Sequence, residues 1–212
     1  MYERLKKIYH RFFSFRDLEI AQALKYLRGC QLVLDIGCGR STFSRGLAYD
    51  QTMRLDWKLD SLRSAYEPGL AAICGNAISL PFADGTFHGV YCAHLIEHLT
   101  PPDAYRLLQE MARVLQVSGV LVVQTPLLHK GFFNDLSHVR PYNPEAILHY
   151  YSVSAHGGGE GISRTYSQID ARFDVLALKY RYAPLYSPAV WPEHDLSRYR
   201  IQLAATAVSF AL

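Results

Sequence analysis

The segment from Val33 to Thr42 constrains the fold of this chain more than any other stretch of its sequence. It begins Val-Leu-Asp-Ile, and two glycines, Gly37 and Gly39, follow before a helical pattern resumes. An apolar run that ends in glycines and then in a helix is typical of a β-strand, a tight turn and a helix N-terminus. The sequence therefore predicts an α/β unit at this point.

The predicted turn is suited to hold a nucleotide. Glycine has no Cβ atom, so the backbone at Gly37 and Gly39 can come close to a bound molecule. The first N–H groups of the following helix have no partner within the helix and can face a ligand. Ser41 or Thr42 is expected to cap that helix.

The position of Asp56 supports a ligand that carries a ribose. The short apolar run from Met53 to Leu55 ends in Asp56, which lies 17 residues beyond Gly39. An acid at the tip of the next parallel strand can accept hydrogen bonds from both hydroxyls of a ribose.

Two residues bear on which ribose cofactor binds. A dinucleotide fingerprint needs a third small residue near position 42, and this chain has Thr42. The carboxylate of Asp35 would repel a pyrophosphate, whereas it would attract a cationic sulfonium. A nicotinamide-dependent oxidoreductase is therefore kept only as an alternative.

Five segments resemble, in the same order, motifs of the class I S-adenosylmethionine-dependent methyltransferases, especially those of ubiquinone and menaquinone biosynthesis. Two of them are the glycine turn and Asp56, and the others are residues 75–87, 94–99 and 113–121. The resemblance runs from residue 32 to residue 126 and continues more weakly to residue 151. Five motifs in the same order are more specific than any one of them.

The resemblance implies S-adenosylmethionine as the cofactor. The residues that it assigns to cofactor binding are Asp35, Gly37, Cys38, Gly39, Asp56, Trp57, Asn76, Ala77 and His94. Asn76 stands where relatives more often have Asp, and its side-chain carbonyl can still accept a hydrogen bond from the adenine amino group. His88 and the turn at 117–119 also differ from the usual pattern, and neither change alters the expected cofactor.

Strands and helices alternate along the chain, which predicts a doubly wound, mainly parallel and Rossmann-like α/β sheet. Strands are expected at 32–36, 53–55, 71–74, 89–92, 119–124 and 173–180, and helices at 16–27, 41–47, 61–65, 102–114 and 144–151. The family also implies a last antiparallel strand near the C-terminus. The alanines of 201–212 favour a helix there instead.

Composition fits one domain over residues 1–212, because 50% of the residues are hydrophobic and 19% are charged. A net charge of +3 is too small to indicate a nucleic-acid partner. No apolar stretch reaches the ~20 residues of a membrane span. The four cysteines show no metal-type spacing, so free thiols in a reducing cytoplasm are expected.

The first 29 residues form a distinct basic segment. They contain seven lysines and arginines but only three acids, interleaved with aromatic residues. We expect an amphipathic helix that covers the domain and closes over the cofactor cleft. Peripheral contact with an anionic membrane or a lipid-linked substrate is the alternative. Residues 126–143 and 152–200 are expected to form loops and a cap on the acceptor side.

Methyl transfer needs alignment rather than a protein nucleophile, but a base helps when the acceptor is a hydroxyl. His98 and His138 are the candidate bases, and a structural hydrogen bond to loop backbone is the alternative for each. Glu97, Arg140 and Tyr142 are candidate substrate-binding residues. We expect O-methylation of a small-molecule or lipid-linked acceptor. A non-catalytic module that binds S-adenosylmethionine is a further alternative.

Residues 94–98 read His-x-x-Glu-His, a pattern found in one class of zinc peptidases. That pattern requires a helix with both histidines on one face, and here it directly follows a predicted buried strand. No metal site is therefore expected. A divalent ion held by Glu97 and His98 next to an acceptor hydroxyl is kept as an alternative. The sequence identifies neither the acceptor nor the oligomeric state.

Overall fold

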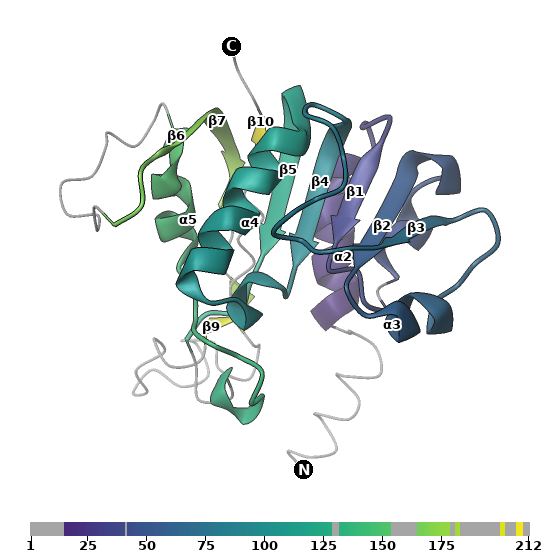
Figure 1. The fold of residues 1–212 in the computed structure, drawn as a ribbon, viewed down its shortest axis with the longest axis horizontal. Helices are drawn as coiled ribbons and strands as arrows, with labels where there is room; N and C mark the ends of the chain where they lie inside the picture. The colour runs from purple at the N-terminus through teal and green to yellow at the C-terminus, as the bar shows by residue number, and fades with distance from the viewer. Residues whose placement is uncertain are drawn as a thin grey trace.

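The computed structural model describes residues 15–40, 42–128, 132–153, 165–178, 181–182, 200–201 and 207–209 (Figure 1). Several predictions fall outside these residues: the first half of the basic segment, the cap by Ser41, and most of the proposed cap at 152–200. The division of the chain into one domain with these loops therefore stays a prediction.

An eight-stranded sheet is the centre of the fold, with the strand order β3-β2-β1-β4-β5-β10-β7-β6. Strands β1 to β5 are mutually parallel, whereas β10 is antiparallel to both β5 and β7. This order confirms the predicted doubly wound, mainly parallel α/β sheet. The strands are β1 Val33–Ile36, β2 Thr52–Asp56, β3 Ala71–Cys74, β4 Phe87–Ala93, β5 Leu115–Gln124, β6 Tyr151–Val153, β7 Ile169–Ala177 and β10 Ala207–Ser209, with β8 Arg181–Tyr182 and β9 Arg200–Ile201 paired separately.

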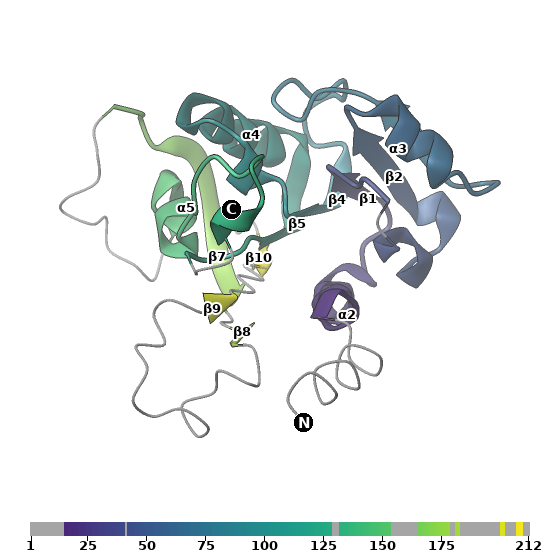
Figure 2. The same cartoon turned by 90° about the horizontal axis from the view of Figure 1, so that it is seen from below.

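The helices agree closely with the sequence pattern. They are α2 Phe15–Leu27, α3 Leu59–Ser64, α4 Pro101–Val114 and α5 Pro144–Tyr150, with short 3-10 turns η1 Phe43–Gly46, η2 Tyr49–Gln51, η3 Ile96–His98 and η4 Phe132–Asn134. In place of the helix expected at 41–47 the structure has only the 3-10 turn η1, and the predicted cap by the Thr42 side chain is wrong, because Thr42 makes no side-chain cap hydrogen bond. Figure 2 shows α2 on one face of the sheet and α4 on the other.

The C-terminal segment corrects one expectation. The alanines of 201–212 favour a helix, but Ala207–Ser209 form strand β10 between β5 and β7. Helix propensities differ by only ~0.5 kcal/mol or so per residue, and a slot between two strands offers hydrogen bonds on both sides. Pairing within the sheet therefore outweighs the local preference of the alanines.

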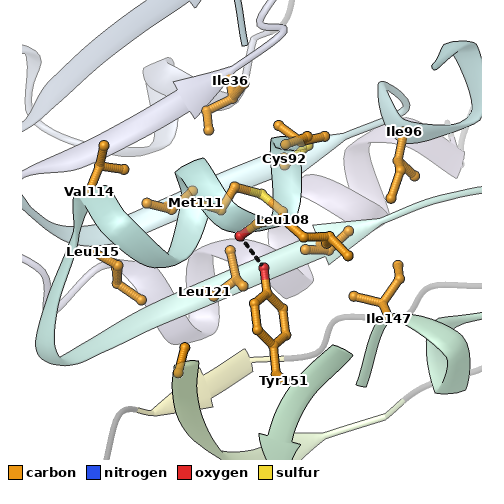
Figure 3. Close-up of a cluster of buried hydrophobic side chains, with 14 of the residues drawn as sticks. Ile36, Cys92, Ile96, Leu108, Met111, Val114, Leu115, Leu121, Ile147 and Tyr151 are labelled. Atoms are coloured by element: carbon orange, nitrogen blue, oxygen red, sulfur yellow. Dashed lines mark hydrogen bonds between the residues drawn. The ribbon is translucent and has the colours of Figure 1, made fainter. Parts of the chain in front are cut away.

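Helix α4 packs its apolar side onto the sheet. The Thr100 hydroxyl accepts a hydrogen bond from the Asp103 N–H, and prolines occupy the first helical positions, which suits a helix start. Its buried residues are Ala104, Leu107, Leu108, Met111 and Val114. Figure 3 shows this cluster, where the Tyr151 hydroxyl donates to the Leu108 carbonyl oxygen over 2.8 Å.

Helix α2 covers the opposite face of the sheet. Its buried residues pack against strand residues that include Val33 and Val122, and the rings of Phe43 and Tyr91 stack with centroids 3.9 Å apart. The described part of the basic segment is therefore a helix that covers the sheet, while its amphipathic character over residues 1–29 and contact with a membrane stay predictions. Among the helices of the described residues, none has both the length and the apolar character needed to cross a bilayer.

Candidate active site

The glycine turn lies where β1 ends. Both Gly37 and Gly39 have positive φ angles, of 68° and 50°, which favour glycine. The two positions have different surroundings. A Cβ atom on Gly37 would approach the Leu95 side chain within 3.0 Å, whereas one on Gly39 would meet only Asp56 Oδ2, at 3.9 Å. Gly37 therefore permits internal packing, and Gly39 faces open space that a ligand can fill.

Asp56 fastens the turn to the end of β2. Its Oδ2 accepts a hydrogen bond from the Gly39 N–H over 2.7 Å, and its Oδ1 accepts one from the Lys58 N–H over 2.8 Å. Each carboxylate oxygen has a second lone pair. Asp56 can therefore hold the turn and still accept hydrogen bonds from a ligand, and its contact with a ribose stays a prediction.

Arg54 is a part of this site that the sequence analysis missed. Its side chain is buried beneath the turn and donates to the carbonyl oxygens of Ala65 and Gly39, over 2.8 and 3.1 Å. The signal for it in the sequence is a cationic residue in the middle of an apolar strand. Such a buried cation needs fixed acceptors.

Asp35 is a buried carboxylate beside the turn. Only 2% of it is exposed, and within the described part of the chain its Oδ2 has no hydrogen-bond partner. Burial raises the pKa of Asp35 to about 7, and the nearby guanidinium groups of Arg54 and Arg16 offset this only partly. The site is therefore suited to a ligand group with a positive charge.

The residues predicted to contact the adenine lie along the next loop. The Gly75 N–H donates to the Asp56 carbonyl oxygen over 3.0 Å, which ties this loop to the end of β2. Trp57 is 71% exposed beside it. Asn76 Oδ1 already accepts a hydrogen bond from the Ile78 N–H over 3.1 Å, so a bond to adenine would share this oxygen. Ala77 is half-buried in the same loop.

The side chain of Cys38 is buried, so it presents little surface to a ligand at the turn. Its N–H and that of Gly37 both donate to the Leu55 carbonyl oxygen, over 3.1 and 2.8 Å. These two amide groups therefore bind β2 and not a ligand.

His94 lies between two carboxylates at the end of β4. Its Nε2 is 3.0 Å from Glu19 Oε2, and its Nδ1 is 3.4 Å from Glu97 Oε1. Burial lowers the pKa of His94, but the hydrogen bonds to these two carboxylates outweigh burial and raise the pKa to about 10. His94 therefore carries a positive charge at neutral pH. The sequence analysis missed Glu19, which α2 brings here from 75 residues away.

His98 and His138 lie side by side, with ring centroids 4.8 Å apart. Nδ1 of His98 is 3.1 Å from the Ser137 carbonyl oxygen, and Nδ1 of His138 is 2.7 Å from the Phe132 carbonyl oxygen. Both histidines thus make a hydrogen bond to loop backbone, which is the alternative to a role as base, and each keeps a second ring nitrogen for chemistry.

Arg140 and Tyr142 line a pocket of about 260 Å³. The Arg140 guanidinium lies over the Tyr142 ring, 5.1 Å from its centroid, and the Tyr142 hydroxyl donates to the Leu99 carbonyl oxygen over 3.1 Å. The other lining residues include Ile96, Tyr105, Leu108, Ile147, Tyr150 and Tyr166. The buried Glu97, also predicted to bind substrate, does not line this pocket.

Comparison with known proteins gives the family to which this sequence is related. Residues 34–123 match the family model described as a methyltransferase domain. O-methyltransferase rstn1 of Aspergillus nomiae is 29% identical over 64% of this chain and 60% of its own length. A demethylmenaquinone methyltransferase of Beutenbergia cavernae is 36% identical over 43% of this chain and 39% of its own. The chain spans about half the length of the curated relatives that it matches.

A solved structure adds the fold to this relationship. The crystal structure of a SAM-dependent methyltransferase from Archaeoglobus fulgidus is similar to this fold, with a TM-score of 0.54 and 28% sequence identity. The match covers 69% of this chain and 72% of the Archaeoglobus chain. Taken with the sheet order and the glycine turn, these matches support a class I S-adenosylmethionine-dependent methyltransferase.

Proposed function

We propose that this protein transfers the methyl group of S-adenosylmethionine to an oxygen atom of a small-molecule or lipid-linked acceptor. The observation that carries the proposal is the buried carboxylate of Asp35, which has an oxygen without a partner among the described residues. It lies beside a glycine turn whose Gly39 faces open space. A cationic aminoacyl sulfonium suits this position, whereas a pyrophosphate would be repelled.

The cofactor supplies an electrophilic methyl group when it is bound, and the chain supplies binding and alignment. In this proposal Asp56 accepts hydrogen bonds from the ribose hydroxyls. Asp35 faces the cationic end of the cofactor. Trp57 offers an exposed ring to the adenine, and Gly39 leaves the space that the cofactor occupies.

In this proposal the acceptor enters the cleft on the side of the loop between β5 and α5. The ring-lined pocket beside Arg140 suits an aromatic or apolar group, and the same loop exposes 98% of Leu136 and 62% of Phe133. Related proteins named for O-methylation and for a menaquinone precursor support an acceptor of this kind. That His98 or His138 removes the acceptor proton stays a prediction.

Calorimetry with S-adenosylhomocysteine tests the cofactor site. Gly39→Val should abolish binding, because a branched side chain would fill the open space and strain a backbone at positive φ. Gly29→Val is the matched control, since a Cβ atom at Gly29 would meet no neighbour within 4 Å and its φ is not positive. Retained affinity in Gly39→Val would place the cofactor elsewhere.

A second experiment separates catalysis from binding alone. The protein is incubated with methyl-labelled S-adenosylmethionine and with aqueous and lipid extracts of a host, and the labelled product is identified. Label on an oxygen atom of a small or lipid-linked product supports the proposal. Cofactor binding without transfer in any fraction would favour the non-catalytic module, and the methyltransferase family match already argues against the nicotinamide alternative.

A further inference from the structure

We infer that Glu97, His98 and His138 form a binding site for a divalent transition-metal ion. Each of the three offers one ligand atom, and these atoms lie within 4.8 Å of one another. Two imidazoles and one carboxylate are a donor set that Mn²⁺, Fe²⁺ and Zn²⁺ accept. Ligand atoms around one such ion are ~3 to 4 Å apart, so a small closure of the side chains completes the site.

Glu97 gives the first independent support. Its side chain is 1% exposed, yet within the described part of the chain Oε1 has no contact closer than the 3.4 Å one with His94 Nδ1, and Oε2 accepts only a long hydrogen bond, of 3.4 Å, from the Thr125 hydroxyl. A buried carboxylate is costly without close partners. A bound cation would give Oε1 a closer partner than His94 Nδ1.

The two histidine rings are already oriented as metal ligands usually are. A carbonyl oxygen can only accept, so the Nδ1 atoms that face Ser137 O and Phe132 O carry the hydrogen in the neutral rings. This assignment leaves the lone pair on Nε2 of each ring. Backbone carbonyls that fix the tautomer in this way are a common support for histidine ligands.

The hydroxyl of Ser137 is consistent with the same assignment. It donates to Asp135 Oδ1 over 2.6 Å, so its oxygen is free to accept from His98 Nδ1, 3.0 Å away. The contacts of Asp135, Ser137 and His98 are therefore satisfied when the hydrogen of the His98 ring is on Nδ1. These contacts do not require a hydrogen on Nε2 of His98.

The loop that carries His138 is held against Glu97. The Val139 N–H donates to the Glu97 carbonyl oxygen over 2.8 Å, and the buried ring of Phe132 packs on His138 with centroids 4.5 Å apart. Asp135 Oδ2 lies 3.9 Å from His138 Nε2. Asp135 and Glu97 together bring two negative charges to the cluster, which suits a divalent cation.

The place of the cluster suggests what the ion would do. Arg140, two residues beyond His138, lines the ring-lined pocket, so the ion would lie beside the proposed acceptor site. An open coordination position there could hold an acceptor oxygen. Only this last step rests on the proposed methyl transfer, because metal binding itself does not depend on it.

Metal binding by the full-length protein tests the inference. After treatment with a chelator, the protein is titrated with Mn²⁺, followed by the electron paramagnetic resonance signal of the free ion, and then with Zn²⁺ by calorimetry. We expect one ion per chain in this cluster. His98→Gln and His138→Gln should each weaken binding by at least ~10-fold, since even residues that only support a ligand have effects of this size.

His149→Gln is the matched control, because His149 is an exposed histidine on α5 outside the cluster. Glu97→Gln keeps the shape of the buried side chain and should also weaken binding. The three histidine variants should keep the wild-type affinity for S-adenosylhomocysteine, which shows that the cofactor site and the fold are intact.

Two outcomes would overturn the inference. In one, the wild-type protein binds no ion. In the other, His98→Gln and His138→Gln bind as tightly as the wild type, which would locate the ion on other histidines of the chain. Since binding of S-adenosylhomocysteine is measured separately, failure of the metal site and failure of the cofactor site remain distinguishable.

Discussion

At the scale of single residues, two aspartates at the ends of neighbouring strands have different environments. Asp56 accepts hydrogen bonds from the backbone N–H groups of Gly39 and Lys58. Asp35 is buried with an unpartnered oxygen among the described residues, and burial raises its pKa to about 7. Asp56 therefore shapes the turn through its hydrogen bonds, while the charge of Asp35 responds to what binds beside it.

The raised pKa of Asp35 predicts that cofactor affinity depends on pH. The α-ammonium group of S-adenosylhomocysteine should bind the ionised carboxylate better, so affinity should fall as the pH is lowered below about 7. The limit is ~10-fold per pH unit for one coupled proton. Calorimetry across this range should show the dependence in the wild type and not in Asp35→Asn.

Asp50→Asn serves as the control for that series, because Asp50 is exposed in η2. It should keep the wild-type pH dependence. Equal pH dependence in Asp35→Asn and the wild type would mean that another group, and not Asp35, meets the ammonium.

At the scale of elements, helices fasten the loops of the cofactor cleft. Arg113 on α4 donates to the carbonyl oxygens of Leu80 and Phe82, over 3.1 and 2.7 Å, and thereby holds the loop expected to contact adenine. On the other face of the sheet, Glu19 of α2 meets His94 at the end of β4. The loops that form the cleft are therefore positioned from both faces of the sheet.

The contact between α2 and β4 predicts how stability changes with pH. The folded pKa of His94, about 10, lies above its ordinary value of 6.5, so the protonated ring stabilises the fold fully below pH 6.5. This contribution should be lost progressively as the pH rises toward 10. We expect the difference in unfolding free energy between wild type and His94→Asn to shrink over that range.

Chemical denaturation at several pH values measures this difference. Asparagine suits the position because His94 has a φ of 52°, which asparagine tolerates well. The buried thiols and tyrosines titrate in both proteins, so their effects cancel in the comparison. A difference that stays constant from pH 6.5 to pH 10 would contradict the role given to His94.

At the scale of the whole molecule, segments far apart in the sequence meet in one pocket. The ring-lined pocket combines residues of η3, α4, α5 and the loop that follows β5. Figure 1 shows that loop at the same end of the molecule as the start of α4. An acceptor bound there would contact several elements at once.

This arrangement predicts the effect of Arg140→Ala on the proposed reaction. If the guanidinium holds an anionic group of the acceptor, the variant should raise KM by about 10-fold or more with a smaller change in kcat. Steady-state kinetics on the identified acceptor checks this expectation, and Arg106→Ala on α4 is the control because Arg106 does not line the pocket. An unchanged KM would remove Arg140 from substrate binding.

The sequence by itself determined strands β1 to β5, helices α2, α4 and α5, and the glycine turn. These features depend on neighbours along the chain: a short apolar run that ends in glycines gives strand and turn, and Thr100 with two prolines gives the start of α4. The order of the motifs also identified the family, which the comparisons confirm. The individual site residues stay predictions until they are tested.

Only the tertiary structure decided which charged and polar groups meet. Glu19 reaches His94 across 75 residues, and His98 reaches the loop of Ser137 across 39. No local sequence pattern predicts such contacts, because they depend on how helices and loops pack on the sheet. The same reason explains β10, where the slot between β5 and β7 outweighs the helix preference of its alanines.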